Sequence, residues 1–287
     1  MTDLTSETEA NAGQKEFWNG DAGLKWVQHA DRLDGLLKPF VSAILDVAQL
    51  QSGEHVLDIG CGAGALSFAA DPPVGRSGGI KGIDISAPLL GLAEKRKTER
   101  QSSAVFEHAD ASAYRSQVPV DAALSRFGVM FFDDPIGAFG SLRRNLRPEG
   151  RLVFACWQEI QQNEWLKLPL ETAMPFFSGL PPMPPPDAPG PFAFADADRV
   201  RKILHEAGWR GIEIKPWSGV LTLPGESIRE RAQFILKMGP VAKMIADQVE
   251  DAEPILSALE EQFAEQQTDT GDVALGAESW IVSAFAS

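Results

Sequence analysis

The sequence predicts an α/β fold in which a largely parallel sheet carries helices on both faces. Apolar, strand-like runs alternate with helical runs between residues 55 and 156, and this order is typical of parallel sheets. A glycine-rich turn follows the first of these strands, with glycines at positions 60, 62 and 64. Because glycine permits a sharp turn and close approach to the backbone, we expect a ligand site at the carboxyl end of this strand.

The elements of this core follow in regular order. The expected strands span residues 55–59, 79–85, 105–108, 120–125 and 151–156, with a turn at 146–150. The expected helices span residues 64–71, 87–99 and 135–146, the first ending near two prolines at 72 and 73. Ser86 can cap the second helix and Pro88 fits its first turn.

The chain on either side of this core is expected to form a lid and insertions. Apolar spacing predicts helices over residues 15–50, and the polar residues 1–14 are expected to be a disordered arm. Residues 51–287 form one α/β domain with insertions at about 157–195 and 225–270. Seven of the eleven residues from Pro181 to Pro191 are proline, which predicts a stiff, extended segment.

Elements are also expected beyond the fifth strand. A helix capped by Asp196 ends at Gly208, and one or two strands occupy residues 211–223. Helices broken at residues 239–240 occupy residues 226–267, and a strand over residues 279–285 closes the chain.

Composition and charge restrict the class of protein. The chain has 287 residues, of which 44% are hydrophobic and 23% charged, a globular balance. No run reaches the roughly eighteen apolar residues of a membrane span, and the polar amino terminus does not resemble a signal peptide. Two cysteines, Cys61 and Cys156, belong to no disulfide or zinc pattern. We therefore expect a cytoplasmic protein without integral membrane association and without a metal.

The net charge of −14 argues against a nucleic-acid partner, since phosphate binding needs a basic surface. A small-molecule substrate is expected instead, bound by either a monomer or a homodimer.

The most informative side chain near the glycine turn is Asp58, two residues before the first glycine. A carboxylate there would repel a pyrophosphate but could hold a cationic amine, which points to S-adenosylmethionine (SAM). Two alternatives stay open at this point. Gly60, Gly62 and Ala65 also fit the dinucleotide fingerprint G-x-G-x-x-A, with Asp84 as its ribose acid, and the turn could bind no ligand.

Five segments in order resemble class I SAM-dependent methyltransferases, similar to the small-molecule enzymes of ubiquinone and menaquinone biosynthesis. They read VLDIGCGAG at 56–64, GIDIS at 82–86, HADA at 108–111, DAALSRFGVMFF at 121–132 and LRPEGRLVF at 146–154. The resemblance covers about residues 40–160. It implies a Rossmann-like sheet of about seven strands with the last one antiparallel, SAM as cofactor and S-adenosylhomocysteine (SAH) as product.

The resemblance also implies roles for single residues. Asp58 would hold the methionine ammonium, and Asp84 would accept both ribose hydroxyls. The backbone of Gly60, Cys61, Gly62 and Gly64 would wrap the methionine and ribose. The other expected cofactor contacts are Ile85 on an adenine face, Asp110 and the Ala111 N–H on the adenine edge, the Ser125 carbonyl on the ammonium, and Arg126. Arg126 could instead reach a substrate carboxylate or pair with an acid.

The acceptor is expected to be small and hydrophobic or aromatic, such as a phenol, quinol or polyketide-like ring. Aromatic residues flank the expected mouth, namely Trp18, Trp26, Phe127 and Trp157; they could equally pack the insertions onto the sheet. In-line displacement requires a base only if the acceptor loses a proton, and His29 and Arg126 are weak catalytic candidates. The alternatives are a phospholipid or amine N-methyltransferase and a non-catalytic SAM-binding regulator.

Overall fold

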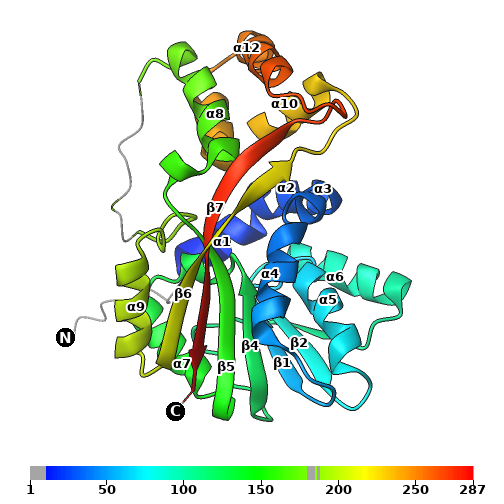
Figure 1. Cartoon of the computed structure of the whole chain (residues 1–287), viewed down its shortest axis with the longest axis vertical. Coiled ribbons are helices and arrows are strands. Elements are labelled where there is room, and N and C mark those ends of the chain that lie inside the picture. The colour runs from blue at the N-terminus through cyan, green and yellow to red at the C-terminus, as the bar shows by residue number, and fades with distance from the viewer. Residues whose placement is uncertain (1–10, 180–184, 186–187, 287) are drawn as a thin grey trace, which may run out of the picture.

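The computed structural model describes residues 11–179, 185 and 188–286 and contains one seven-stranded sheet (Figure 1). The strands run in the order β3-β2-β1-β4-β5-β7-β6. Their bounds are β1 His55–Ile59, β2 Gly79–Asp84, β3 Val105–His108, β4 Val120–Arg126, β5 Leu146–Trp157, β6 Arg210–Thr222 and β7 Ala274–Phe285. Strands β1 to β5 pair in parallel, whereas β7 is antiparallel to both of its neighbours. The predicted Rossmann-like mixed sheet is confirmed.

Twelve helices surround this sheet in the described part of the chain. Those of the first half are α1 Ala12–Asn19, α2 Asp21–Gln28, α3 Ala30–Leu36, α4 Lys38–Ala48, α5 Ala65–Val74 and α6 Ala87–Arg100. Those of the second half are α7 Pro135–Arg143, α8 Glu164–Ala173, α9 Ala197–Glu206, α10 Ile228–Leu236, α11 Gly239–Gln248 and α12 Glu253–Glu265. Helices α4, α5 and α6 cover one face of the sheet, and α7 and α9 cover the other (Figure 1).

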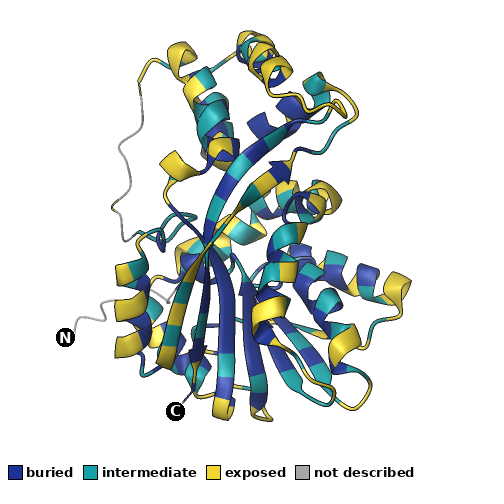
Figure 2. Ribbon diagram, viewed as in Figure 1, coloured by how far each residue is buried: buried dark blue, intermediate teal, exposed yellow. Residues whose placement is uncertain are grey.

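A cap stands beyond the carboxyl ends of the parallel strands. Helices α8, α10, α11 and α12 contact one another and pack around the long antiparallel pair of β6 and β7 (Figure 1). Helices α1 to α3 lie between this cap and the sheet, where the lid was expected. The central strands β1, β4 and β5 are almost wholly buried, while the edge strand β6 is largely exposed (Figure 2). The rigid centre of the sheet therefore presents its carboxyl ends to the lid and cap.

Several boundaries differ from the predictions: β7 begins at Ala274 rather than at residue 279, α7 ends at Arg143 rather than at residue 146, and three further differences need comment. Helix α5 continues through Pro72 and Pro73 to Val74, although neither proline has an N–H to donate along the helix. Val74 is buried, and its carbonyl accepts from the Gly53 N–H at 2.9 Å, so packing against the neighbouring loop accompanies the longer helix. Residues 146–150 belong to the irregular start of β5 rather than to a turn, since Leu146 pairs with Val120. The third difference is the amino-terminal arm: residues 1–10 lie outside the described residues, but helix α1 already begins at Ala12.

The insertion expected at 157–195 is partly helical, because it contains α8. Most of its proline-rich part, residues 180–184 and 186–187, lies outside the described residues. None of the described helices combines the length and apolar character needed to cross a membrane.

Candidate active site

The turn after β1 is held in a conformation that only glycine adopts easily. Gly60, Gly62 and Gly64 have φ angles of 63°, 55° and 86°. A Cβ on Gly60 would lie 2.9 Å from the Cα of Gly128, and one on Gly64 would meet the ring of Phe68 at 2.7 Å. The three glycines therefore allow this loop to pass closely between β4 and α5.

Asp58, in β1, is a buried carboxylate of which one oxygen accepts a hydrogen bond and the other accepts none from the described residues. Its side chain is 2% exposed, and Ser67 Oγ of α5 donates to Oδ2 at 2.6 Å. Oδ1 has no hydrogen-bond partner among the described residues. Burial raises the pKa of Asp58 to about 7. An unpaired buried acceptor costs free energy, and the ammonium of SAM would satisfy it, so this residue fits the predicted cofactor.

Asp84, at the end of β2, is also buried, but both of its oxygens are engaged. The backbone N–H of Gly62 donates to Oδ2 at 2.7 Å, and that of Ser86 donates to Oδ1 at 2.8 Å. Burial raises its pKa, although these two hydrogen bonds oppose the shift. A carboxylate has about four acceptor positions, so the side chain that fixes the glycine turn can still accept two ribose hydroxyls.

Asp110 lies at the third strand end, against the amino-terminal segment. The Ser112 N–H donates to its Oδ1 at 2.9 Å, and Asn11 Nδ2 donates to Oδ1 and Oδ2 at 3.0 and 3.1 Å. Burial opposes ionisation, but the hydrogen bonds from Ser112 and Asn11 outweigh it and lower the pKa of Asp110. Sequence reasoning missed Asn11, because it falls within the expected disordered arm.

Several other predicted cofactor residues lie around the same loop. The Ile85 carbonyl accepts hydrogen bonds from Asn19 Nδ2 at 2.8 Å and His108 Nε2 at 2.9 Å. Ala111 is buried and follows Asp110 directly in the chain. Burial raises the pKa of the Cys61 thiol well above its usual value, so this thiol is unreactive.

Ser125 connects the first and fourth strand ends. Its hydroxyl donates to the Ile59 carbonyl at 2.7 Å and accepts from the Gly128 N–H at 3.1 Å. The side chain of Ser125 therefore positions the backbone around the glycine turn, while the role expected of its carbonyl stays a prediction.

Arg126, at the end of β4, pairs with an acid. Its Nη2 donates to Asp34 Oδ1 of α3 at 2.6 Å, while its buried Nη1 has no partner among the described residues. Arg96 donates to the other oxygen of Asp34 at 2.8 Å and to the Ala63 carbonyl at 3.1 Å. Asp34 thus joins the lid to both β4 and the glycine turn. No sequence pattern links Asp34 to Arg96 and Arg126, which lie 62 and 92 positions away from it in the chain.

Aromatic rings fill the space beside Arg126. Phe127, with a φ of 64°, stacks on Trp157 with ring centroids 4.0 Å apart and planes 7° apart. Trp165 of α8 follows at 5.1 Å from Trp157, and Phe40 touches Phe127 at 4.8 Å. The buried Nε1 of Trp165 has no partner among the described residues.

The predicted lid tryptophans form a second aromatic group on the other side of the glycine turn. Trp18 lies 5.6 Å from Trp26 and 5.4 Å from Phe131, and its carbonyl accepts from Ser86 Oγ at 2.8 Å. Phe194, another aromatic residue of the insertion, packs 5.9 Å from Phe139 of α7. The aromatic residues of the insertions thus divide between the site and the sheet.

His29, at the junction of α2 and α3, faces the cap. Its ring contacts Phe234 of α10 edge-on at 5.9 Å. Burial, Lys237 and Arg32 lower its pKa from 6.5, so the imidazole is neutral at pH 7. Neither Arg32 nor Lys237 is ion-paired within the part of the chain that the structure describes.

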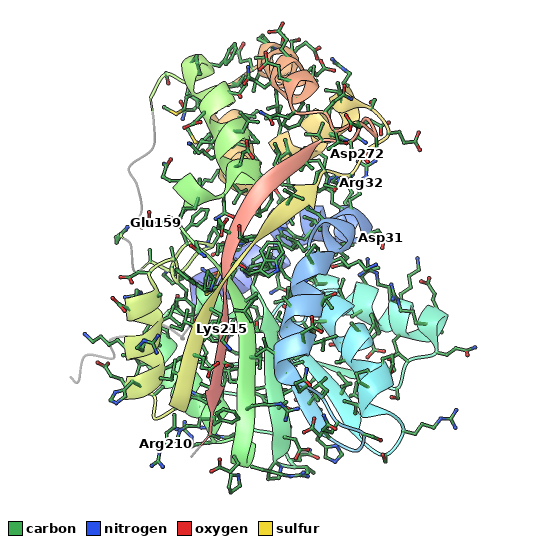
Figure 3. All side chains as sticks on the ribbon, in the orientation of Figure 1. Asp31, Arg32, Glu159, Arg210, Lys215 and Asp272 are labelled. Carbon is green, nitrogen blue, oxygen red and sulfur yellow. The ribbon has the colours of Figure 1, made fainter. Side chains whose placement is uncertain are left out.

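Two surface hollows are lined by residues other than the glycine turn and the strand-end carboxylates. One of about 920 Å³ has Arg143, Arg201 and Arg210 on its walls, at the end of the sheet away from the lid. Figure 3 shows Arg210 at this far end, distant from Asp31 and Arg32. The second hollow, of about 500 Å³, lies between α3 and the segments that follow β6 and precede β7. Arg32 and Asp272 are on its walls (Figure 3). The described residues contain no group of three or more side chains suited to hold a metal.

Comparisons with known proteins identify the family of this chain. Residues 50–208, more than half of the chain, match a family model described as a methyltransferase domain. Aklanonic acid methyltransferase DauC of a Streptomyces species is 33% identical over 119 residues, which cover 40% of this chain and 54% of that protein. Demethylmenaquinone methyltransferase of Staphylococcus saprophyticus is 23% identical over 204 residues, which cover 66% of this chain and 86% of that protein.

Solved structures show the same fold at low sequence identity. The YcgJ protein of Bacillus subtilis superimposes with a TM-score of 0.56 and 13% identity, covering 85% of this chain and 97% of that one. A phosphoethanolamine N-methyltransferase of Haemonchus contortus superimposes with a TM-score of 0.52 and 17% identity, covering 85% of this chain and 52% of that one.

Proposed function

The chain belongs to the methyltransferase-domain family and is a SAM-dependent methyltransferase of small molecules, and from this premise we propose that its acceptor is an oxygen-bearing aromatic ring. When bound, SAM supplies a methyl group already activated by its sulfonium. What remains for the protein is to bind the cofactor, to orient the acceptor and, where needed, to take a proton.

We assign the cofactor to the strand-end carboxylates. Asp58 would bind the ammonium through its unpaired Oδ1, Asp84 the ribose hydroxyls, and Asp110 the adenine amine. The single observation that carries this assignment is Asp58, because a buried acceptor without a partner is rare unless a ligand completes it. The glycine turn and the positions predicted at Ile85, Ala111 and Ser125 would complete the cofactor contacts.

The acceptor would lie beyond β4, between the lid and the cap. The buried rings of Phe127 and Trp157, stacked on each other, would border it, and Trp165 Nε1 and Arg126 Nη1 are buried donors without partners among the described residues. Rings attract a planar acceptor, and unpaired donors attract oxygens on that ring. The same donors would leave a saturated hydrocarbon poorly bound, which favours a phenol, quinol or polyketide-like ring.

We propose His29 as the group that takes the proton from an acceptor hydroxyl. Its neutral imidazole can accept a proton at pH 7, and its neighbours Arg32 and Lys237 would stabilise a phenolate. The same two positive charges would repel a cationic amine. They therefore favour the ring over an amine acceptor. A phosphorylated amine, the kind of acceptor after which the Haemonchus enzyme is named, stays the second candidate.

The experiment is a transfer assay with methyl-labelled SAM and a panel of phenols, hydroquinones and phosphoethanolamine. We expect methylation of ring hydroxyls, with kcat lowered about a hundredfold in His29→Gln and SAH affinity unchanged. Since the pKa of His29 lies below 6.5, the wild-type rate should fall only at more acidic pH.

Other outcomes would each contradict a separate part of the proposal. Methylation of phosphoethanolamine alone would replace the ring by the amine alternative. Tight SAH binding with no acceptor turned over would favour the non-catalytic regulator. Unchanged SAH affinity in both Asp58→Ala and Asp84→Ala would overturn the cofactor assignment.

A further inference from the structure

The side chain of Asn11 is seated on Asp110, where the proposed function places the adenine amine. Asn11 is 4% exposed although it lies at the start of the described chain. Its Nδ2 donates to both oxygens of Asp110, at 3.0 and 3.1 Å, and to Ser112 Oγ at 3.1 Å. A planar carboxamide NH₂ and an adenine NH₂ offer the same pair of donors.

Asp133 binds the side-chain oxygen and the backbone N–H of Asn11. The Asp133 N–H donates to Asn11 Oδ1 at 3.0 Å, and the Asn11 N–H donates to Asp133 Oδ2 at 2.8 Å. The backbone of Asn11 is left-handed, with a φ of 58°, a conformation that asparagine tolerates better than most residues. Asn11 is therefore anchored on two sides, immediately before α1 begins at Ala12.

Asn11 and Ser112 together take most of the hydrogen-bonding capacity of Asp110. A carboxylate has about four acceptor positions. Oδ1 already accepts from the Ser112 N–H at 2.9 Å, from Ser112 Oγ at 2.6 Å and from Asn11. Oδ2 accepts from Asn11 and lies 3.7 Å from Lys15 Nζ. An adenine amine that approaches Oδ2 would therefore compete with the amide of Asn11 for this oxygen.

We infer that Asn11 is an internal competitor of the cofactor, a side chain that closes the adenine end of the site and must be displaced when SAM binds. This inference rests on the proposed assignment of Asp110. Competition lowers the apparent affinity by the fraction of molecules in which Asn11 has left Asp110. The same exchange would help release SAH after transfer, because Asn11 can replace the departing amine.

Asn19, at the other end of α1, provides a matched control. Its Nδ2 donates to the Ile85 carbonyl at 2.8 Å, and its Oδ1 accepts from the Ala87 N–H at 3.0 Å. Both Asn residues therefore tie the lid to the cofactor loops, but only Asn11 occupies an acceptor assigned to the cofactor. A substitution that merely loosens α1 should act equally at both positions.

The test is calorimetric titration of SAH into wild type, Asn11→Ala and Asn19→Ala. We expect Asn11→Ala to bind SAH about tenfold more tightly than wild type, and Asn19→Ala to show no gain. Unchanged or weaker binding by Asn11→Ala would mean that Asn11 only covers the site, and equal gains in both variants would indicate general loosening of the lid. Either result overturns the inference.

A second ligand separates this inference from the assignment on which it rests. S-inosylhomocysteine carries an oxygen in place of the adenine amine, so the gain from Asn11→Ala should be confined to SAH. If wild type binds the two ligands equally, the assignment of Asp110 to the amine fails. If wild type prefers SAH but Asn11→Ala brings no gain, that assignment stands and the competitor fails alone.

Discussion

The proposed cofactor side and the proposed acceptor side of the site consist of different kinds of residue. On the cofactor side, carboxylates at neighbouring strand ends are fixed by backbone N–H groups and a hydroxyl, as with Asp84 and Asp58. On the acceptor side, rings from distant segments pack against one another, as with Phe127, Trp157 and Trp165. The first side selects its ligand by fixed polar positions, and the second by shape and a few unpaired donors. The two sides should therefore respond differently to substitution.

A second contrast lies within the cofactor side. Asp84 accepts two backbone N–H groups and thereby shapes the glycine turn before any ligand arrives. Asp58 accepts one hydroxyl and keeps an oxygen without a partner among the described residues. Asp84 should therefore serve both structure and binding, whereas Asp58 should serve mainly binding.

The largest expected effect is that of Asp84→Ala. The substitution removes the acceptor for the Gly62 and Ser86 N–H groups together with the proposed ribose contacts. We expect SAH affinity to fall about a hundredfold, which corresponds to about 2.7 kcal/mol, as measured by calorimetry.

Asp71→Ala is the matched control for this loss. Asp71 is a hydrogen-bonded carboxylate on α5 that accepts from Ser102 and Ser103, outside the cleft. Its removal should lower stability and leave SAH affinity unchanged. If Asp84→Ala bound SAH as well as Asp71→Ala does, the carboxylate of Asp84 would have no role in cofactor binding.

This contrast also explains how much could be predicted from the sequence. The positions of Asp58 and Asp84 followed from local order, because a strand, a turn and a helix that are consecutive in the chain create each strand end. The partners Asn11, Asp34 and Arg96 could not be found in this way. Asn11 and Asp34 belong to amino-terminal segments that are far in sequence from the residues they contact. These contacts depend on how the lid packs on the sheet.

The same reasoning applies to the aromatic residues. From the sequence alone, an aromatic residue can be assigned either to the core or to the mouth of the site. Only tertiary packing distinguishes Phe194, which contacts Phe139 of α7, from Trp157, which stacks on Phe127 after β4. The boundary errors at Pro72 and at residues 146–150 have the same origin, since neighbouring elements extended a helix and a strand beyond their local signals.

The second effect, expected to be about tenfold, is that of pH on cofactor binding through Asp58. With a pKa of about 7, its carboxyl is mostly ionised at pH 8 and mostly protonated at pH 6. Because the ammonium needs the ionised form, wild-type SAH affinity should fall about tenfold between these values. Asp58→Asn should bind weakly at both. A wild-type affinity independent of pH in this range would contradict the role of Asp58.

Stability without cofactor should change in the opposite direction. The pKa of Asp58 is raised on folding, so the folded chain binds more protons than the unfolded chain between about pH 4 and pH 7. Stability from this group is therefore present at low pH and is lost as the pH rises toward 7. Denaturant titrations should show that this slope is weaker in Asp58→Asn.

The smallest expected effect tests the acceptor side through one atom. Trp165→Phe removes an N–H that has no partner among the described residues, so stability should change little. If that N–H binds an acceptor oxygen, kcat/KM for a ring acceptor should fall about fivefold, the worth of one neutral hydrogen bond, with SAH affinity unchanged. Trp209→Phe is the control. Trp209 Nε1 donates to the Phe139 carbonyl at a distance of 3.1 Å, and this hydrogen bond lies away from the proposed site. That control should lose stability and keep kcat/KM. The opposite pattern, in which Trp165→Phe loses stability and keeps kcat/KM, would make Trp165 a packing residue and leave acceptor choice to the shape of the ring cluster alone.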